Sequence, residues 1–176
     1  METVLILDFG AQYSQLIARR VREQNVYCEV KPCSISPAEI EKIAPIGIIL
    51  SGGPQSVYES VSPHVDPALF ALGIPVLGIC YGCQLMAYSL GGTVAAATEA
   101  TAREYGKTLT EFDTDCSIFQ GLPASSVTWM SHGDYISQVP DGFAVTAKTA
   151  VCPTAAMACP EKKLCLLYTS PSPRDS

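Results

Sequence analysis

Four short, mostly apolar runs recur along the first eighty residues: Val4–Leu7, Tyr27–Val30, Ile46–Leu50 and Pro75–Ile79. Runs of four or five such residues, bounded by turn residues, are typical of strands that are buried on both faces of a parallel sheet. The pattern therefore predicts four parallel strands in the first half of the chain.

Helical patterns fill the intervals between these runs. Apolar residues recur at helical spacing in Gln12–Glu23, which predicts an amphipathic helix. Ser36 is a predicted helix N-cap, because a proline follows it and Glu39 closes a capping box. Two further helices are expected at Pro67–Leu72 and Gly82–Leu90, and a glycine pair ends the second.

The pattern changes beyond Gly92, where short strand patterns follow one another without helices between them. They cover Lys107–Thr110, Val127–Met130, Phe143–Ala147 and Ala155–Ala158. Consecutive strands joined by short turns favour antiparallel pairing. We therefore predict one α/β domain over residues 1–164: an open, mostly parallel, doubly wound (flavodoxin-like) sheet with an antiparallel extension.

Composition supports a globular domain and narrows its partners. The 176 residues are 48% hydrophobic and 16% charged, and the net charge of −6 disfavours binding to nucleic acid or anionic membranes. No apolar run approaches the roughly 20 residues that a membrane-spanning helix needs. Several of the eight cysteines lie in apolar runs and no basic leader is present, so we expect a reduced, cytoplasmic protein.

Cys80 stands between the fourth predicted strand and the following helix, in Gly78-Ile79-Cys80-Tyr81-Gly82. Glycine two places before and two places after is the arrangement of a nucleophile elbow, a turn too sharp for larger side chains. The N–H groups of a helix N-terminus favour a thiolate, so we expect the pKa of the Cys80 thiol to be lowered toward neutrality. The sequence thus predicts a nucleophile rather than a structural cysteine.

Cys80 and Cys83 also form a Cys-x-x-Cys pair, so a thioredoxin-like dithiol is an alternative. Gly78 and the position of the pair after the fourth strand disfavour it. A zinc site would need a second pair of ligands, and the chain has only two histidines, His64 and His132. We expect Cys83 to be a packing residue.

The loop Ser51-Gly52-Gly53-Pro54 follows the third strand, which is expected beside the fourth. A glycine pair in such a loop can direct a backbone N–H toward the same point as the N–H of Tyr81. Two such donors form an oxyanion hole for acyl transfer. A glycine pair alone is more often a simple turn, so this prediction depends on Cys80.

Several separated motifs together resemble the class I glutamine amidotransferases, and among these the amidotransferase domain of GMP synthases. They are Leu7–Glu23, Ser51–Pro54, Gly78–Gln84, Arg103–Gly106 and Trp129–Asp134. The resemblance covers residues 3–164 and keeps the family's order of motifs. It implies that Cys80 attacks the side-chain amide of glutamine, forming a glutamyl thioester that water hydrolyses.

The resemblance implies further roles. Gly53 and Tyr81 would supply the oxyanion N–H groups. Five residues would hold the two ends of the substrate or support the loop that does so: Gln84, Ser131, His132, Gly133 and Asp134. The glutaminase step is expected to need no cofactor or metal. Its ammonia would pass to an ATP-pyrophosphatase domain, absent here, that uses ATP and Mg to convert xanthosine monophosphate to GMP.

The family pairs its nucleophile with a His-Pro-Glu motif near the end of the domain, and this chain lacks one. Cys159-Pro160-Glu161 differs by one letter and is better interpreted as a hairpin turn, with the family's histidine expected shortly after Leu164. Thr169–Ser176 instead form a Pro/Ser-rich segment, and the chain from Cys165 or Leu166 onward resembles vector or adapter sequence, so we expect a disordered, non-native tail over residues 165–176.

Without that base pair, we expect the chain to be inactive or weakly active, although its nucleophile and substrate residues are present. His64, in a proline-rich stretch, is expected at the surface. A non-catalytic regulatory or interaction module of the same fold is the alternative function.

Overall fold

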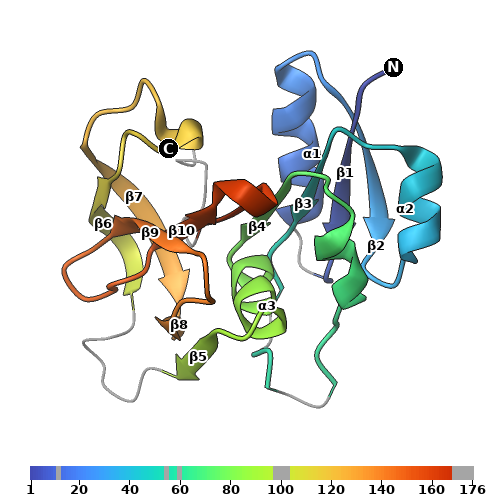
Figure 1. The fold of residues 1–176 in the computed structure, drawn as a ribbon. Coiled ribbons are helices and arrows are strands. Elements are labelled where there is room, and N and C mark those ends of the chain that lie inside the picture. The colour runs from blue at the N-terminus through green and yellow to red at the C-terminus, as the bar shows by residue number, and fades with distance from the viewer. Residues whose placement is uncertain (11–12, 54–55, 59–60, 97–103, 168–176) are drawn as a thin grey trace.

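The strands form two sheets, and their arrangement follows the predicted α/β pattern (Figure 1). The computed structural model describes residues 1–10, 13–53, 56–58, 61–96 and 104–167. The strands are β1 (Thr3–Asp8), β2 (Tyr27–Pro32), β3 (Gly47–Leu50), β4 (Val76–Ile79), β5 (Thr93–Ala96), β6 (Glu104–Phe112), β7 (Ser125–His132), β8 (Asp134–Gln138), β9 (Ala144–Lys148), β10 (Ala156–Cys159) and β11 (Leu164–Leu167). The helices are α1 (Tyr13–Glu23), α2 (Pro37–Ile43) and α3 (Tyr81–Ser89), with short 3₁₀ turns η1 (Pro67–Ala71), η3 (Ser117–Phe119) and η4 (Pro160–Lys162).

The parallel half of the larger sheet has the strand order β2-β1-β3-β4-β11, and each neighbouring pair in it is parallel. Alternation along β1 sends side chains to both faces, because Leu5 belongs to one hydrophobic cluster and Ile6 to another. Ile17 of α1 packs with Ile6, whereas Leu85 of α3 packs with Leu5. The two helices therefore cover opposite faces of the sheet, and the doubly wound prediction is confirmed.

The predicted helices form with small changes at their ends. The capping box of α2 is present, because the Ser36 hydroxyl accepts from the Glu39 N–H and the Glu39 carboxylate accepts from the Ser36 N–H. The first helix begins at Tyr13, and Gln12 lies outside the described residues. None of the described helices is long and apolar enough to cross a membrane.

The antiparallel extension continues the same sheet through β10, β9, β6 and β7, beside the parallel half in Figure 1. All four predicted strands of this region form. The sequence missed β5 and β8, which pair antiparallel as a second sheet. Each of these short strands buries one large apolar side chain, Val94 in β5 and Ile136 in β8. A strand with a single buried apolar residue shows no alternation of apolar and polar positions, so the sequence gives no strand pattern to recognise.

The end of the described chain differs from the prediction. Leu164–Leu167 form β11 between β4 and β10, so disorder does not begin at Cys165 as expected. This apolar run has the hydrophobicity of a central strand, and the sheet supplies a partner on each side. Residues 168–176 lie outside the described residues. The limits of the domain and the non-native origin of the tail stay predictions.

Candidate active site

The turn at Cys80 has the expected elbow geometry. Cys80 is the N-cap of α3 with φ of +52° and ψ of −113°, a strained conformation for a residue that is not glycine. A Cβ at Gly78 would lie 2.8 Å from the Gly82 carbonyl oxygen, and one at Gly82 would lie 2.6 Å from Leu50 Cβ. The two flanking glycines are thus required by close backbone packing, and the turn presents Cys80 at the end of β4.

The surroundings of the Cys80 thiol differ from the expectation. Its half-buried side chain packs against the hydrophobic cluster that contains Ile6, Ile17 and Ile79. Burial raises the pKa of the Cys80 thiol to about 11, where the sequence predicted a lowered value. The physical cause is that a thiolate loses its hydration among apolar side chains.

Cys83 belongs to the other face of the sheet. It is fully buried in the cluster that contains Leu50 and Leu85, whereas Cys80 packs against the cluster on the α1 face. Burial raises the pKa of the Cys83 thiol, and the neighbouring cysteines, Cys80 among them, add to this effect. All eight cysteines of the chain are reduced. The two side chains pack in different hydrophobic clusters, which disfavours a dithiol function for the Cys-x-x-Cys pair.

The glycine loop after β3 lies against the elbow, as the sequence predicted. A Cβ at Gly52 would lie 3.7 Å from Cys80 Cβ, and a Cβ at Gly53 would lie 3.0 Å from Tyr81 Cγ. The N–H of Gly82 donates to the Ser51 carbonyl at 3.2 Å and ties the loop to the first turn of α3. The predicted oxyanion-hole residues, Gly53 and Tyr81, therefore lie next to each other, and the adjoining Gly52 lies beside Cys80.

Gln84 lies one helical turn beyond Cys80 and is 8% exposed. Its backbone N–H donates to the Cys80 carbonyl at 3.2 Å. Its side-chain Oε1 is buried and has no hydrogen-bond partner among the described residues. A buried acceptor without a donor costs about 1–3 kcal/mol, so such an atom is suited to accept from a bound ligand.

The remaining predicted substrate residues lie at the junction of β7 and β8. The backbones of Ser131 and His132 end β7, opposite β6, and Gly133 forms the bend between the strands. Asp134 is half-buried at the start of β8, opposite Ala96 of β5. Because β8 contacts α3, this segment is connected to the helix that begins at Cys80.

The histidine at position 64 lies far from the nucleophile. Its Nδ1 is 2.7 Å from the Ser62 carbonyl oxygen, and its ring packs edge-on against Tyr88 with centroids 6.2 Å apart. Tyr88 is eight residues beyond Cys80 on α3, about 12 Å along the helix axis. Among the described side chains, therefore, His64 is not placed to act as the base for Cys80.

The segment Cys159-Pro160-Glu161 forms the predicted turn. Pro160–Lys162 make a single 3₁₀ turn, and the N–H of Lys163 donates to the Pro160 carbonyl at 3.1 Å. This turn joins β10 to β11, and β11 runs parallel to β4 with Leu167 opposite Ile79. The end of β11 therefore reaches the level of the residue just before Cys80.

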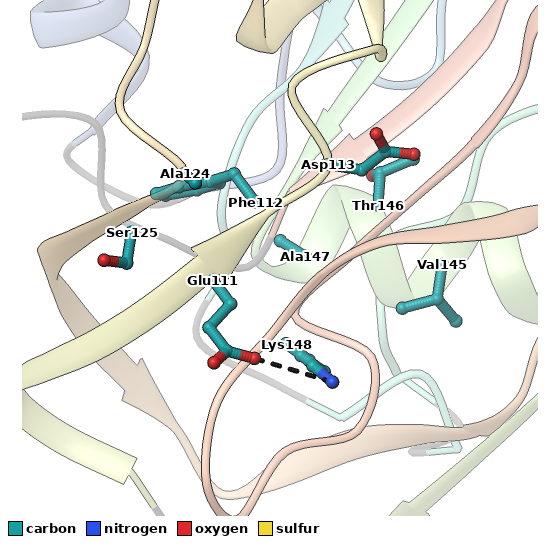
Figure 2. Close-up of a pocket in the computed structure, with 9 residues that line it drawn as sticks. All are labelled: Glu111, Phe112, Asp113, Ala124, Ser125, Val145, Thr146, Ala147 and Lys148. Carbon is teal, nitrogen blue, oxygen red and sulfur yellow. Dashed lines mark ion pairs between the residues drawn. The ribbon is translucent and has the colours of Figure 1, made fainter.

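A surface hollow lies elsewhere, and no sequence pattern pointed to it (Figure 2). It has a volume of about 620 Å³ and lies where β6, β7 and β9 meet. An ion pair between Lys148 Nζ and Glu111 Oε2, 3.5 Å long, stands at its rim. Thr146 is one of the residues that line it, and its buried hydroxyl has no hydrogen-bond partner in the described part of the chain. None of the predicted site residues lines this hollow.

Curated relatives share most of this chain. It is 54% identical over 163 residues to a protein named GMP synthase [glutamine-hydrolyzing] from Clostridium botulinum (strain Alaska E43 / Type E3). It is 56% identical over 163 residues to the protein of the same name from Caldanaerobacter subterraneus subsp. tengcongensis. Each match covers 93% of this chain but only 31% of the relative, so the chain spans about a third of their length.

A solved structure has the same fold over nearly the whole chain. It is the crystal structure of a putative GMP synthase subunit from Thermoplasma acidophilum, with a TM-score of 0.82 and 27% identity. The match covers 99% of this chain and 86% of that one. The model of the family described as "Glutamine amidotransferase class-I" matches residues 5–166. With the elbow at Cys80, these matches show that the chain belongs to the class I glutamine amidotransferase family.

Proposed function

We propose that this chain is the glutaminase domain of a GMP synthase and that Cys80 is its nucleophile. The observation that carries the proposal is the strained elbow at Cys80, with the Gly52–Gly53 loop packed against it. The thiolate sulfur would attack the side-chain amide carbon of glutamine, and ammonia would leave as the C–N bond breaks. Water then hydrolyses the thioester, so that glutamine and water give glutamate and ammonia.

The neighbouring residues have separate roles in this proposal. The N–H groups of Gly53 and Tyr81 would stabilise the oxyanion of each tetrahedral intermediate. The buried Oε1 of Gln84 suits the α-amino group of the substrate, because an ammonium group supplies the donor that this atom lacks. The segment from Ser131 to Asp134 would hold the other end of the substrate, with His132 supporting it. No metal or organic cofactor takes part in these steps.

The raised pKa of Cys80 is consistent with weak activity. With a pKa of about 11, roughly one thiol in ten thousand is ionised at pH 7. The register of β11 against β4 supports a base supplied by residues just after β11, because that strand ends beside the elbow. We expect a chain with the family's His-Pro-Glu there to be far more active.

The proposal extends to a second domain that would use the ammonia, as in a whole GMP synthase. The ammonia would be used by an ATP-pyrophosphatase domain that aminates xanthosine monophosphate with ATP and Mg, in the cytoplasm. The length of the relatives supports such a partner, since this chain spans 31% of them. A non-catalytic module of the same fold is the second candidate, and the raised pKa of Cys80 favours it.

Labelling with a glutamine analogue tests the nucleophile directly. We expect a diazoketone analogue of glutamine to modify Cys80 and free glutamine to block the reaction, as seen by mass spectrometry of the peptide. Labelling that glutamine leaves unchanged would contradict a glutamine site. Glutaminase rates of this chain and of one with a His-Pro-Glu continuation after β11 then test the missing base. Comparable rates would contradict that part of the proposal and leave the nucleophile assignment intact.

A further inference from the structure

The ring of Tyr13 and the side chain of Cys80 both lie close to Gly52. A Cβ at Gly52 would be 3.7 Å from Cys80 Cβ and 3.8 Å from Tyr13 Cδ2. Both distances are ordinary van der Waals contacts, so a single carbon atom would touch both side chains at once. The space beside Gly52, where a larger residue would place its Cβ, is thus bordered by both Cys80 and the Tyr13 ring.

The start of α1 holds Tyr13 in this place. Oδ1 of Asp8, at the end of β1, accepts hydrogen bonds from the Gly10 N–H at 3.0 Å and the Ser14 hydroxyl at 2.6 Å. Ile17, one turn further along α1, is buried in the cluster against which Cys80 packs. The backbone that carries Tyr13 is therefore fixed both to the end of β1 and to the surroundings of Cys80.

The Tyr13 side chain contributes little to the fold itself. It is 51% exposed, and among the described residues its hydroxyl has no hydrogen-bond partner and its ring no aromatic one. Tyr81 differs, because its hydroxyl donates to the Pro63 carbonyl at 2.7 Å and its ring packs on Phe9. An exposed aromatic ring needs no special explanation, but one that borders the same glycine as Cys80 is placed to contact a ligand that reaches Cys80.

We propose that Tyr13 forms one wall of the cleft through which the substrate side chain reaches Cys80, and that its ring packs on the substrate's methylene groups. The inference rests on the proposed glutaminase function and deepens it. A fixed apolar wall would hold the glutamyl side chain in line with the thiol. The same wall would limit the access of small reagents, such as iodoacetamide, that gain no binding energy from contact with the ring. Tyr13 is then a specificity-determining residue.

Two electrophiles separate these effects. We would measure the rate constants for Cys80 modification at pH 9 by iodoacetamide and by the diazoketone analogue of glutamine, using the mass of the Cys80 peptide. Tyr13→Ala is expected to slow the diazoketone reaction about tenfold, because the contact to the methylene groups is lost. The same substitution should leave the iodoacetamide reaction unchanged or make it faster. Tyr13→Phe keeps the ring and should stay within about twofold of the parent for both reagents.

Tyr27 provides a matched control. It is another half-exposed tyrosine, on β2, and its hydroxyl donates to Glu29. Tyr27→Ala should change neither rate, and a thermal melt of each variant confirms that it is folded. Equal changes for the two reagents in Tyr13→Ala, or no change for either, would overturn the inference. Failure of the diazoketone to modify Cys80 in the parent, while iodoacetamide does so, would instead reject the proposed function and the inference together.

A double substitution examines the gap itself. Gly52→Ala places a methyl group between Tyr13 and Cys80 and should slow the diazoketone reaction. Removing the ring in Tyr13→Ala reopens that space, so the double variant should react faster than Gly52→Ala alone. If the two sites were independent, the factors by which each single substitution slows the diazoketone reaction would multiply in the double variant. Multiplied losses would show that Tyr13 does not form the wall opposite Cys80.

Discussion

The two halves of this molecule use glycine in opposite ways. At the elbow, a side chain at Gly82 would collide with Leu50 of the neighbouring strand. In the antiparallel extension, Gly106 has a φ of +102° and nothing within 4 Å of a Cβ built on it. Gly82 is required by packing between elements, whereas Gly106 is required only by the conformation of its own backbone.

The same contrast applies to exposure. Seven of the nine residues of α3 are buried, which fixes the helix that Cys80 begins. The paired strands β6 and β7 instead expose Leu109, Val127 and Trp129 on one face. The proposed site at Cys80 therefore lies in the half whose helix is mostly buried. Rigid surroundings are what a strained nucleophile turn needs, since strain persists only where the fold enforces it.

The largest expected effect comes from removing the nucleophile. Cys80→Ser should abolish modification by the glutamine analogue, and in a chain with the His-Pro-Glu continuation it should lower the glutaminase rate at least about 10³-fold. Cys116→Ser changes a half-buried cysteine of the extension and serves as the control. Peptide mass and an ammonia-release assay measure the two effects. If Cys116→Ser also lost activity, the activity would not depend specifically on the half of the molecule that contains Cys80.

The pH dependence of Cys80 modification should be almost as large. Only the thiolate reacts, and the pKa of Cys80 is raised to about 11 by burial. The rate of iodoacetamide modification should therefore rise roughly tenfold per pH unit, about 10³-fold from pH 7 to pH 10. Peptide-level rates at five pH values measure this. A plateau above pH 8 would show that the helix N-terminus outweighs burial, as the sequence first indicated.

The two glycines allow a matched test of stability. Gly82→Ala forces the Leu50 strand or α3 to move and should cost about 2–4 kcal/mol of unfolding free energy. Gly106→Ala meets open space and should cost only about 1–2 kcal/mol, from its positive φ. Urea unfolding of both variants gives the comparison. Equal losses would mean that the elbow is no more tightly packed than the extension.

The smallest effect is expected at the rim of the hollow in Figure 2. Glu111 and Lys148 form an ion pair 3.5 Å long, but both side chains are more than 60% exposed. Glu111→Ala should change the unfolding free energy by less than about 1 kcal/mol, because solvent screens such pairs. It should leave Cys80 modification unchanged. A larger loss of unfolding free energy, measured by urea unfolding, would show that this ion pair stabilises the extension.

Sequence reasoning was most accurate where a local pattern is also the physical cause. In the capping box, Ser36 and Glu39 each accept a hydrogen bond from the backbone N–H of the other, so the residues that form the cap are the ones that can be read in the sequence. The glycines around Cys80 are likewise required by the turn in which they stand. The four parallel strands followed from continuous apolar runs. Short strands such as β5 were missed, because one buried side chain makes no pattern.

Tertiary structure decided what depends on neighbours distant in the sequence. The pKa of Cys80 is raised because Ile6 and Ile17, far away in the chain, surround it, and no local rule contains that effect. The same holds for β11, whose residues are ordered because β4 and β10 stand on either side. The gap between Tyr13 and Cys80 likewise exists only where α1 and the β3 loop meet. By itself, the sequence determined the sharp turn at Cys80, through the glycines on either side of it, whereas packing decided the surroundings of its thiol.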